Sequence, residues 1–140
     1  MVQKDSVRPV DKVKTIAVDL DATLAEYDGW QGEGNIGQPL EGARDFLQEL
    51  SDKGLYIIIH TARLSVAKHH LYDFESLSRV YHHIKDWLRY HQMPYNEIYT
   101  GQGKPDAKAF VDDRGVSCRP QDDKNAYKSA LESIYKLVKE

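Results

Sequence analysis

The sequence predicts a three-layer α/β/α sandwich with a mainly parallel sheet. Short runs of β-branched and aliphatic residues alternate with segments of helical periodicity, which is typical of consecutive βαβ units. Three of the predicted strands end in acidic, hydroxyl or basic residues. The 140 residues contain no internal repeat and no linker long enough to separate two domains. We therefore expect a single domain over residues 1–140.

The first half of the chain is predicted to form a strand, a flap, a helix and a second strand. Residues 13–20 are rich in valine and isoleucine and too short for a helix, which favours a buried strand. Residues 25–40 are rich in glycine and polar residues and predict a loop, the flap, beside the end of that strand. Apolar residues at helical spacing predict a helix over 43–53, and the run LYIIIH predicts a buried strand over 55–60.

The second half continues the alternation of helices and strands. Residues 64–92 predict two helical pieces that end before a proline. Short strands are expected over 96–100 and 107–111. Apolar residues recur at helical spacing from Tyr127 to Val138 and predict a C-terminal helix with one apolar stripe.

Composition limits the compartment and the partners. A net charge of -3 argues against a general nucleic-acid or membrane-surface binder. The single cysteine, Cys118, excludes a disulfide within the chain. The first twelve residues lack the apolar core of a signal peptide, and the aliphatic run at 57–59 is far too short to span a membrane. The sequence therefore predicts a cytoplasmic protein without a membrane segment.

Four carboxylates are predicted to meet at one edge of the sheet. Asp19 and Asp21 follow the first strand, and Asp112 and Asp113 follow the fourth. The carboxyl ends of parallel strands share an edge, where ligands bind. Clustered carboxylates repel one another unless a cation neutralises them, and magnesium prefers such oxygen ligands. The sequence thus predicts a Mg²⁺ site at this edge.

The remaining polar residues at the same edge suit phosphoryl transfer. Hydroxyl and cationic groups of Thr61, Arg63 and Lys104 could bind phosphate oxygens. A carboxylate can act as the nucleophile, and a second one two positions along an extended chain can act as acid and base. Arg63 and Arg114 are equally consistent with pairing to a carboxylate.

Three segments carry a resemblance to a known family. IAVDLDATLA resembles the first motif of the haloacid dehalogenase-like (HAD) phosphohydrolases, and IIIHTAR resembles their second motif. KPDAKAFVDDRG resembles the joined third and fourth motifs. The segments occur in the family's order and extend from residue 16 to residue 115. The resemblance implies a Rossmann-like, HAD-like fold and a magnesium-dependent phosphatase that acts through an aspartyl-phosphate.

The resemblance also implies a role for each matched residue. Asp19 would be the nucleophile and a magnesium ligand, and Asp21 would be the acid/base, with its backbone carbonyl on the metal. Thr61 would hydrogen-bond the transferring phosphoryl group, and Lys104 would hold nucleophile and phosphate together. The substrate-binding residues would be Thr61, Ala62, Arg63 and Lys104.

Three details stay open in the sequence. Asp113 is expected to bind the metal directly, and Asp112 through water or by orienting Lys104, but the order could be reversed. Lys108 competes with Lys104 for the phosphate-binding role, and Lys104 is preferred because it lies between a glycine and a proline. Ala22 stands where many phosphatases of the family have glycine.

The chain also resembles the capless members of the family, because no cap domain fits between its motifs. An open cleft suits a phosphorylated small molecule or the phosphorylated end of a macromolecule, and a homo-oligomer could supply a lid. The alternatives are a polynucleotide 3′-phosphatase-like activity, disfavoured by the acidic charge, and a non-catalytic phosphate-binding module. Tyr27 and Trp30 in the flap are consistent with substrate contact and equally with anchoring of the loop.

Overall fold

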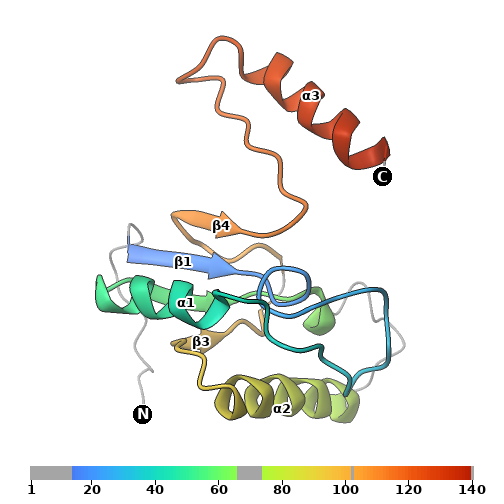
Figure 1. The fold of residues 1–140 in the computed structure, drawn as a ribbon. Coiled ribbons are helices and arrows are strands. Elements are labelled where there is room, and N and C mark those ends of the chain that lie inside the picture. Colours follow the sequence, from blue (N-terminus) through green and yellow to red (C-terminus); the bar gives the residue numbers. More distant parts are fainter. Residues whose placement is uncertain (1–13, 66–73, 102, 140) are drawn as a thin grey trace.

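A four-stranded parallel sheet forms the centre of the molecule (Figure 1). The computed structural model describes residues 14–65, 74–101 and 103–139. The strands lie in the order β3-β2-β1-β4, and every neighbouring pair is parallel. Their bounds are Thr15–Val18 for β1, Tyr56–Ile59 for β2, Glu97–Ile98 for β3 and Ala109–Val111 for β4. The predicted α/β class with a parallel Rossmann-like sheet is confirmed.

The two central strands are mostly apolar because both of their faces are buried. All four residues of β1 are buried, and so are Ile57, Ile58 and Ile59 of β2. Backbone pairing continues one residue past each of these strands. The Asp19 amide donates to the Val111 carbonyl at 2.9 Å, and the His60 amide donates to the Val18 carbonyl at 2.9 Å. The polar residues that follow the strands are therefore held by the sheet.

Helices α1 (Ala43–Asp52) and α2 (Phe74–Tyr90) complete the core. Alternate residues of the central strands point to one face of the sheet. Leu47 of α1 and Ile84 and Leu88 of α2 belong to the same apolar cluster as these strand residues, which are Ile16, Val18, Ile57 and Ile59. Helix α1 ends where Gly54 takes a φ of +80°, a conformation that glycine adopts at little cost.

The predicted pair of helices over 64–92 is confirmed in its second part. A short 3₁₀ turn, η2 (Ala62–Leu64), follows β2, and α2 begins at Phe74. Most of the first predicted piece lies outside the described residues. Helix α2 ends four residues before Pro94, and Gln92 then turns the chain with a φ of +56°.

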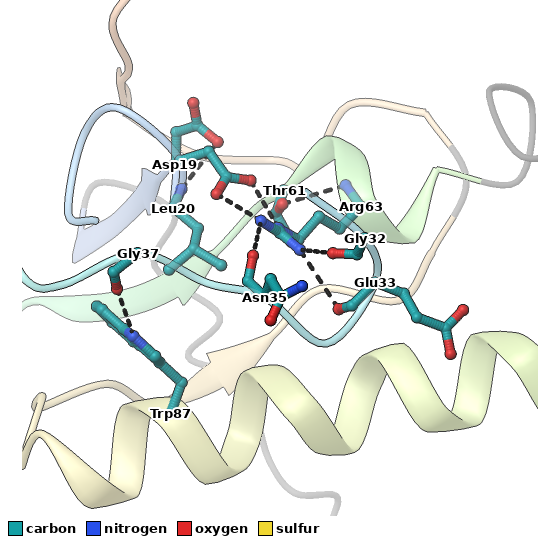
Figure 2. A network of polar contacts seen from close by, with 10 residues as sticks. Asp19, Leu20, Gly32, Glu33, Asn35, Gly37, Thr61, Arg63 and Trp87 are labelled. Carbon is teal, nitrogen blue, oxygen red and sulfur yellow. Dashed lines mark hydrogen bonds and ion pairs between the residues drawn. The ribbon is translucent and has the colours of Figure 1, made fainter. Parts of the chain in front are cut away.

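The flap, residues 25–40, is a loop closed at its base. Ala25 and Pro39 form an isolated antiparallel bridge. Gly37 packs so closely on the Glu26 backbone that a side chain at this position would collide with the Glu26 carbonyl oxygen. The Trp87 indole of α2 donates to the Gly37 carbonyl at 2.9 Å (Figure 2). The flap is thus fastened both to itself and to α2.

Helix α3 (Ala126–Lys139) stands clear of the sheet (Figure 1). The predicted C-terminal helix is confirmed, and its apolar stripe is largely solvent-exposed. The exposed fractions are 68% for Tyr127, 48% for Leu131, 40% for Ile134 and 75% for Val138. Among the helices that the structure describes, none combines the length and the hydropathy of a membrane span.

Candidate active site

A tight turn after β1 presents the first two aspartates. The Asp19 side chain accepts a hydrogen bond from the Leu20 amide at 2.8 Å. Ala22 then takes a φ of +66°, and its amide donates to the Ala25 carbonyl at 2.8 Å. Glycine adopts this left-handed conformation at lower cost than alanine. The turn therefore forms in spite of the alanine.

A cleft of about 1140 Å³ opens at the carboxyl ends of β1, β2 and β4. It brings together all the residues that the sequence predicts for the site. These are Asp19, Asp21, Thr61, Ala62, Arg63, Lys104, Asp112 and Asp113. Lys108 is not among the residues that line the cleft, and its amide pairs with the Thr15 carbonyl at the start of β1. Of the two candidate lysines, Lys104 is the one at the cleft.

Thr61 is buried at the end of β2, where it caps η2. Its hydroxyl oxygen accepts a hydrogen bond from the Arg63 amide at 3.1 Å. A threonine hydroxyl that accepts one hydrogen bond can still donate another. The capping role and the predicted phosphate contact are therefore compatible.

Arg63 forms a two-point ion pair with Asp21. Its Nε donates to Oδ2 of Asp21 at 2.7 Å, and its Nη2 donates to Oδ1 at 2.9 Å. The side chains of Arg63 and Asp21 are 3% and 18% exposed. Bidentate pairs of this kind are among the strong polar contacts in proteins. Of the two predicted partners of Arg63, the structure shows the carboxylate.

The Asp19 carboxyl lies in an environment that disfavours its charge. Burial is the largest cause that raises its pKa, followed by the charges of Asp113, Asp21 and Asp112, while the Leu20 amide lowers it. The resulting pKa is about 7, against an ordinary value of 3.8. The four carboxylates therefore interact at the cleft, as the sequence predicts.

Asp112 and Asp113, which follow β4, lie in two different environments. One oxygen of Asp112 accepts hydrogen bonds from the Arg114 amide at 3.1 Å and from the Gly115 amide. A side chain at position 115 would crowd that same oxygen. Asp113 faces the Arg114 side chain at 3.7 Å and is 32% exposed. Asp112 thus shapes the turn, whereas the Asp113 carboxylate is left more open.

Aromatic residues form much of the rest of the cleft. The Lys104 ammonium lies 4.5 Å from the centre of the Phe110 ring. His60 meets Tyr99 edge to ring with 5.5 Å between centroids, and burial lowers the pKa of His60. Tyr99 and Phe110 are cleft residues that sequence reasoning missed. Tyr99 directly follows β3, so the strand-end rule that identified Asp19 could also have found it.

The carboxylates at the cleft are oxygen donors of the type that magnesium prefers. Within the described ranges, no three His, Cys, Asp or Glu side chains are arranged to hold a metal ion. Asp21 is paired to Arg63 and Asp112 caps a turn, so the carboxylates with the fewest or longest contacts are Asp19, which accepts from the Leu20 amide, and Asp113, which lies 3.7 Å from Arg114. Magnesium is commonly held by one or two carboxylates together with waters and substrate phosphate. The oxygen donors at the cleft fit that pattern.

In the absence of metal, Asp19 is expected to destabilise the folded chain as pH rises. Its folded-state pKa is about 7 and its ordinary value is 3.8, so between these values only the folded state keeps the proton. Stability then falls from about pH 4 to about pH 7, and the loss is complete above that range. With chelator at about pH 8, Asp19→Asn should melt a few degrees higher than the unmodified chain.

The same thermal melts contain the control. Near pH 3 the two proteins should melt alike, because Asp19 is then largely protonated whether the chain is folded or unfolded. Magnesium at pH 8 should stabilise the unmodified chain and not Asp19→Asn. A melting difference that stays constant with pH would contradict the prediction.

Comparison with known proteins supports the fold. No protein-family model matches the chain, and no curated protein matches it. A solved structure of a conserved protein from Bacteroides thetaiotaomicron is 21% identical and has a TM-score of 0.51; the match covers 88% of this chain and 98% of that one. A protein from Vibrio cholerae is 28% identical over 86% of this chain and 98% of its own, with a TM-score of 0.47. The first likeness supports the α/β architecture alone.

Proposed function

We propose that the chain is a magnesium-dependent phosphatase that hydrolyses phosphate monoesters through an aspartyl-phosphate on Asp19. The observation that carries this proposal is the convergence of three distant segments on one cleft. Residues 19–21, 61–63 and 104–113 supply carboxylates, a hydroxyl and cations to its lining. The resemblance of the same segments to HAD phosphohydrolase motifs adds support.

In the first proposed step, a carboxylate oxygen of Asp19 attacks phosphorus and the ester P–O bond breaks. The leaving oxygen takes a proton from Asp21, which has to be protonated and turned away from Arg63 for this step. The Thr61 hydroxyl and the Lys104 ammonium donate hydrogen bonds to the phosphoryl oxygens, where negative charge gathers in the transition state. The products are the free alcohol and the aspartyl-phosphate.

In the second step, water attacks phosphorus and gives a proton to Asp21. The bond between phosphorus and the Asp19 oxygen breaks, which releases inorganic phosphate and restores the carboxylate. Asp21 has then regained the proton that it lost to the alcohol. The net reaction is hydrolysis of one ester bond by one water molecule.

Magnesium would be held by the carboxylates of Asp19 and Asp113. When bound, it would offset the negative charge of the carboxylates and of the phosphate. Asp19 can attack only in its ionised form, and its raised pKa leaves part of it protonated at neutral pH. A nearby cation favours the ionised form. The electrostatics of Asp19 therefore support a requirement for metal.

The direct test is turnover of an aryl phosphate by the purified chain with magnesium and with chelator. We expect release of phosphate that depends on magnesium. A panel of nucleotides, sugar phosphates, phosphopeptides and 3′-phosphorylated oligonucleotides would then rank the substrates. Absence of turnover across the panel would overturn the proposal, and phosphate-ester binding without turnover would favour a binding module.

A further inference from the structure

Arg63 is a buried cation that contacts two separate parts of the chain. Besides the Asp21 carboxylate, its guanidinium donates to backbone carbonyls of the flap (Figure 2). Nη2 binds the Asn35 carbonyl at 3.0 Å, and Nη1 lies 3.4 Å from the Glu33 carbonyl and 3.5 Å from that of Gly32. These three flap residues follow one another closely, so one side chain orders a whole turn of the flap.

The geometry of the guanidinium makes the two sets of contacts depend on one another. The group is planar and rigid, with its N–H donors in a fixed fork. Nη2 donates to Asp21 and to Asn35 at the same time. Trp30 of the flap lies over the same group, with 5.0 Å from the ring centroid to Cζ of Arg63. A rotation that served only one partner would misalign the others.

We propose that Arg63 is a positioning residue that couples the flap to Asp21. Asp21 orients the guanidinium, and the oriented guanidinium holds the flap turn at Gly32–Asn35. Without the carboxylate, the arginine side chain would regain rotamer freedom, and ordering it for the flap contacts would cost more entropy. The position of the flap and the orientation of Asp21 are therefore set together.

The coupling has a consequence for the cleft. Tyr27 and Trp30 of the flap line it, so release of the flap turn would move one wall. When Asp21 turns from Arg63 towards a leaving oxygen or a water, the hold on the flap would weaken. Opening of the cleft would then accompany proton transfer. This consequence rests on the proposed function, whereas the coupling of flap and Asp21 does not.

A second arginine provides a matched control. Arg79 of α2 also binds the flap, through the Glu33 side chain at 2.9 Å. This contact reaches the flap from a different helix and through a side chain rather than the backbone. Loss of Arg79 should therefore loosen the flap independently of Asp21.

The experiment is hydrogen–deuterium exchange of amides 29–36 in metal-free protein without substrate. Asp21→Asn keeps the shape of the side chain, and Arg63→Lys keeps the charge. Each should raise exchange in the flap by about tenfold or more, because each breaks the two-point pair. The double variant should exchange no faster than the faster single variant. Arg79→Gln combined with Asp21→Asn should instead show additive effects.

Two outcomes would overturn the proposal. If Asp21→Asn leaves flap exchange unchanged, Asp21 does not order the guanidinium for the flap. If Asp21→Asn and Arg63→Lys add, the two residues act separately. Asp21→Asn alone decides the question should Arg63→Lys fail to fold. Because no substrate is present, a chain without phosphatase activity would still give a clear result.

Activity supplies a second readout where the unmodified chain turns over an aryl phosphate. Arg63→Lys should lower kcat more than Arg79→Gln does, since Arg63 contacts both Asp21 and the flap, whereas Arg79 contacts the flap and not Asp21. Equal kcat for Arg63→Lys and the unmodified chain would argue that the alignment of Asp21 does not matter for turnover. The exchange data would still report on the coupling itself.

Discussion

Replacement of Asp19 by asparagine is expected to reduce magnesium-dependent phosphate release by at least about 10³-fold, because the amide cannot serve as the nucleophile. The substitution is nearly isosteric, and the amide oxygen can still accept the Leu20 amide hydrogen bond. The measurement is kcat with an aryl phosphate under saturating substrate and magnesium. A loss of folding would be detected separately by circular dichroism.

Asp45→Asn is the matched control for this prediction. Asp45 lies exposed in the first turn of α1, outside the residues that line the cleft. The control variant should keep the kcat of the unmodified chain. Full activity of Asp19→Asn would remove the assigned nucleophile and, with it, the aspartyl-phosphate mechanism.

Leu88→Ala is expected to lower the free energy of unfolding by about 2–5 kcal/mol, the range for leucine truncation in a well-packed core. Leu88 is fully buried in α2, within the cluster that joins the helices to the sheet. A loss of this size is a large fraction of the stability of a typical domain. Urea denaturation monitored by circular dichroism would measure it.

Leu131→Ala in α3 makes the same chemical change on a surface that is 48% exposed. It should cost less than about 1 kcal/mol, because little apolar surface returns to water and no core cavity forms. A cost equal to that of Leu88→Ala would contradict the exposed position of α3. A cost that rises with protein concentration would show that a second copy of the chain covers the stripe.

Most of the fold could be predicted from local patterns. Runs of isoleucine and valine identified the two central strands, and apolar spacing identified the helices around Leu47, Ile84 and Leu131. Among the described residues, most strand ends lie one or two residues inside the predicted bounds, although amides just outside the strands, such as those of Asp19, His60 and Lys108, still pair with a neighbouring strand. The hydrophobic periodicity of the sequence does not show at which residue the backbone pairing of a strand ends.

The residues of the candidate site could also be predicted, because parallel strands bring their carboxyl ends to one edge. This rule needs only the order and direction of the strands, and it gathered Asp19, Thr61 and Asp113 into the cleft. The strand-end rule does not give the partner of Arg63, and it does not choose between Lys104 and Lys108. Both depend on side-chain positions in the folded chain.

By itself, the sequence determined which elements form and which polar residues meet at the cleft, because periodicity and strand ends are local signals. Only the tertiary structure decided which contacts these residues make. The contacts of Arg63 join it to residues 28 and 42 positions away, and no local pattern specifies such pairs. The raised pKa of Asp19 is likewise a property of burial and of neighbours brought together by folding. The two aspartates after β1 therefore differ in their surroundings, since Asp21 is paired to Arg63 and Asp19 is not.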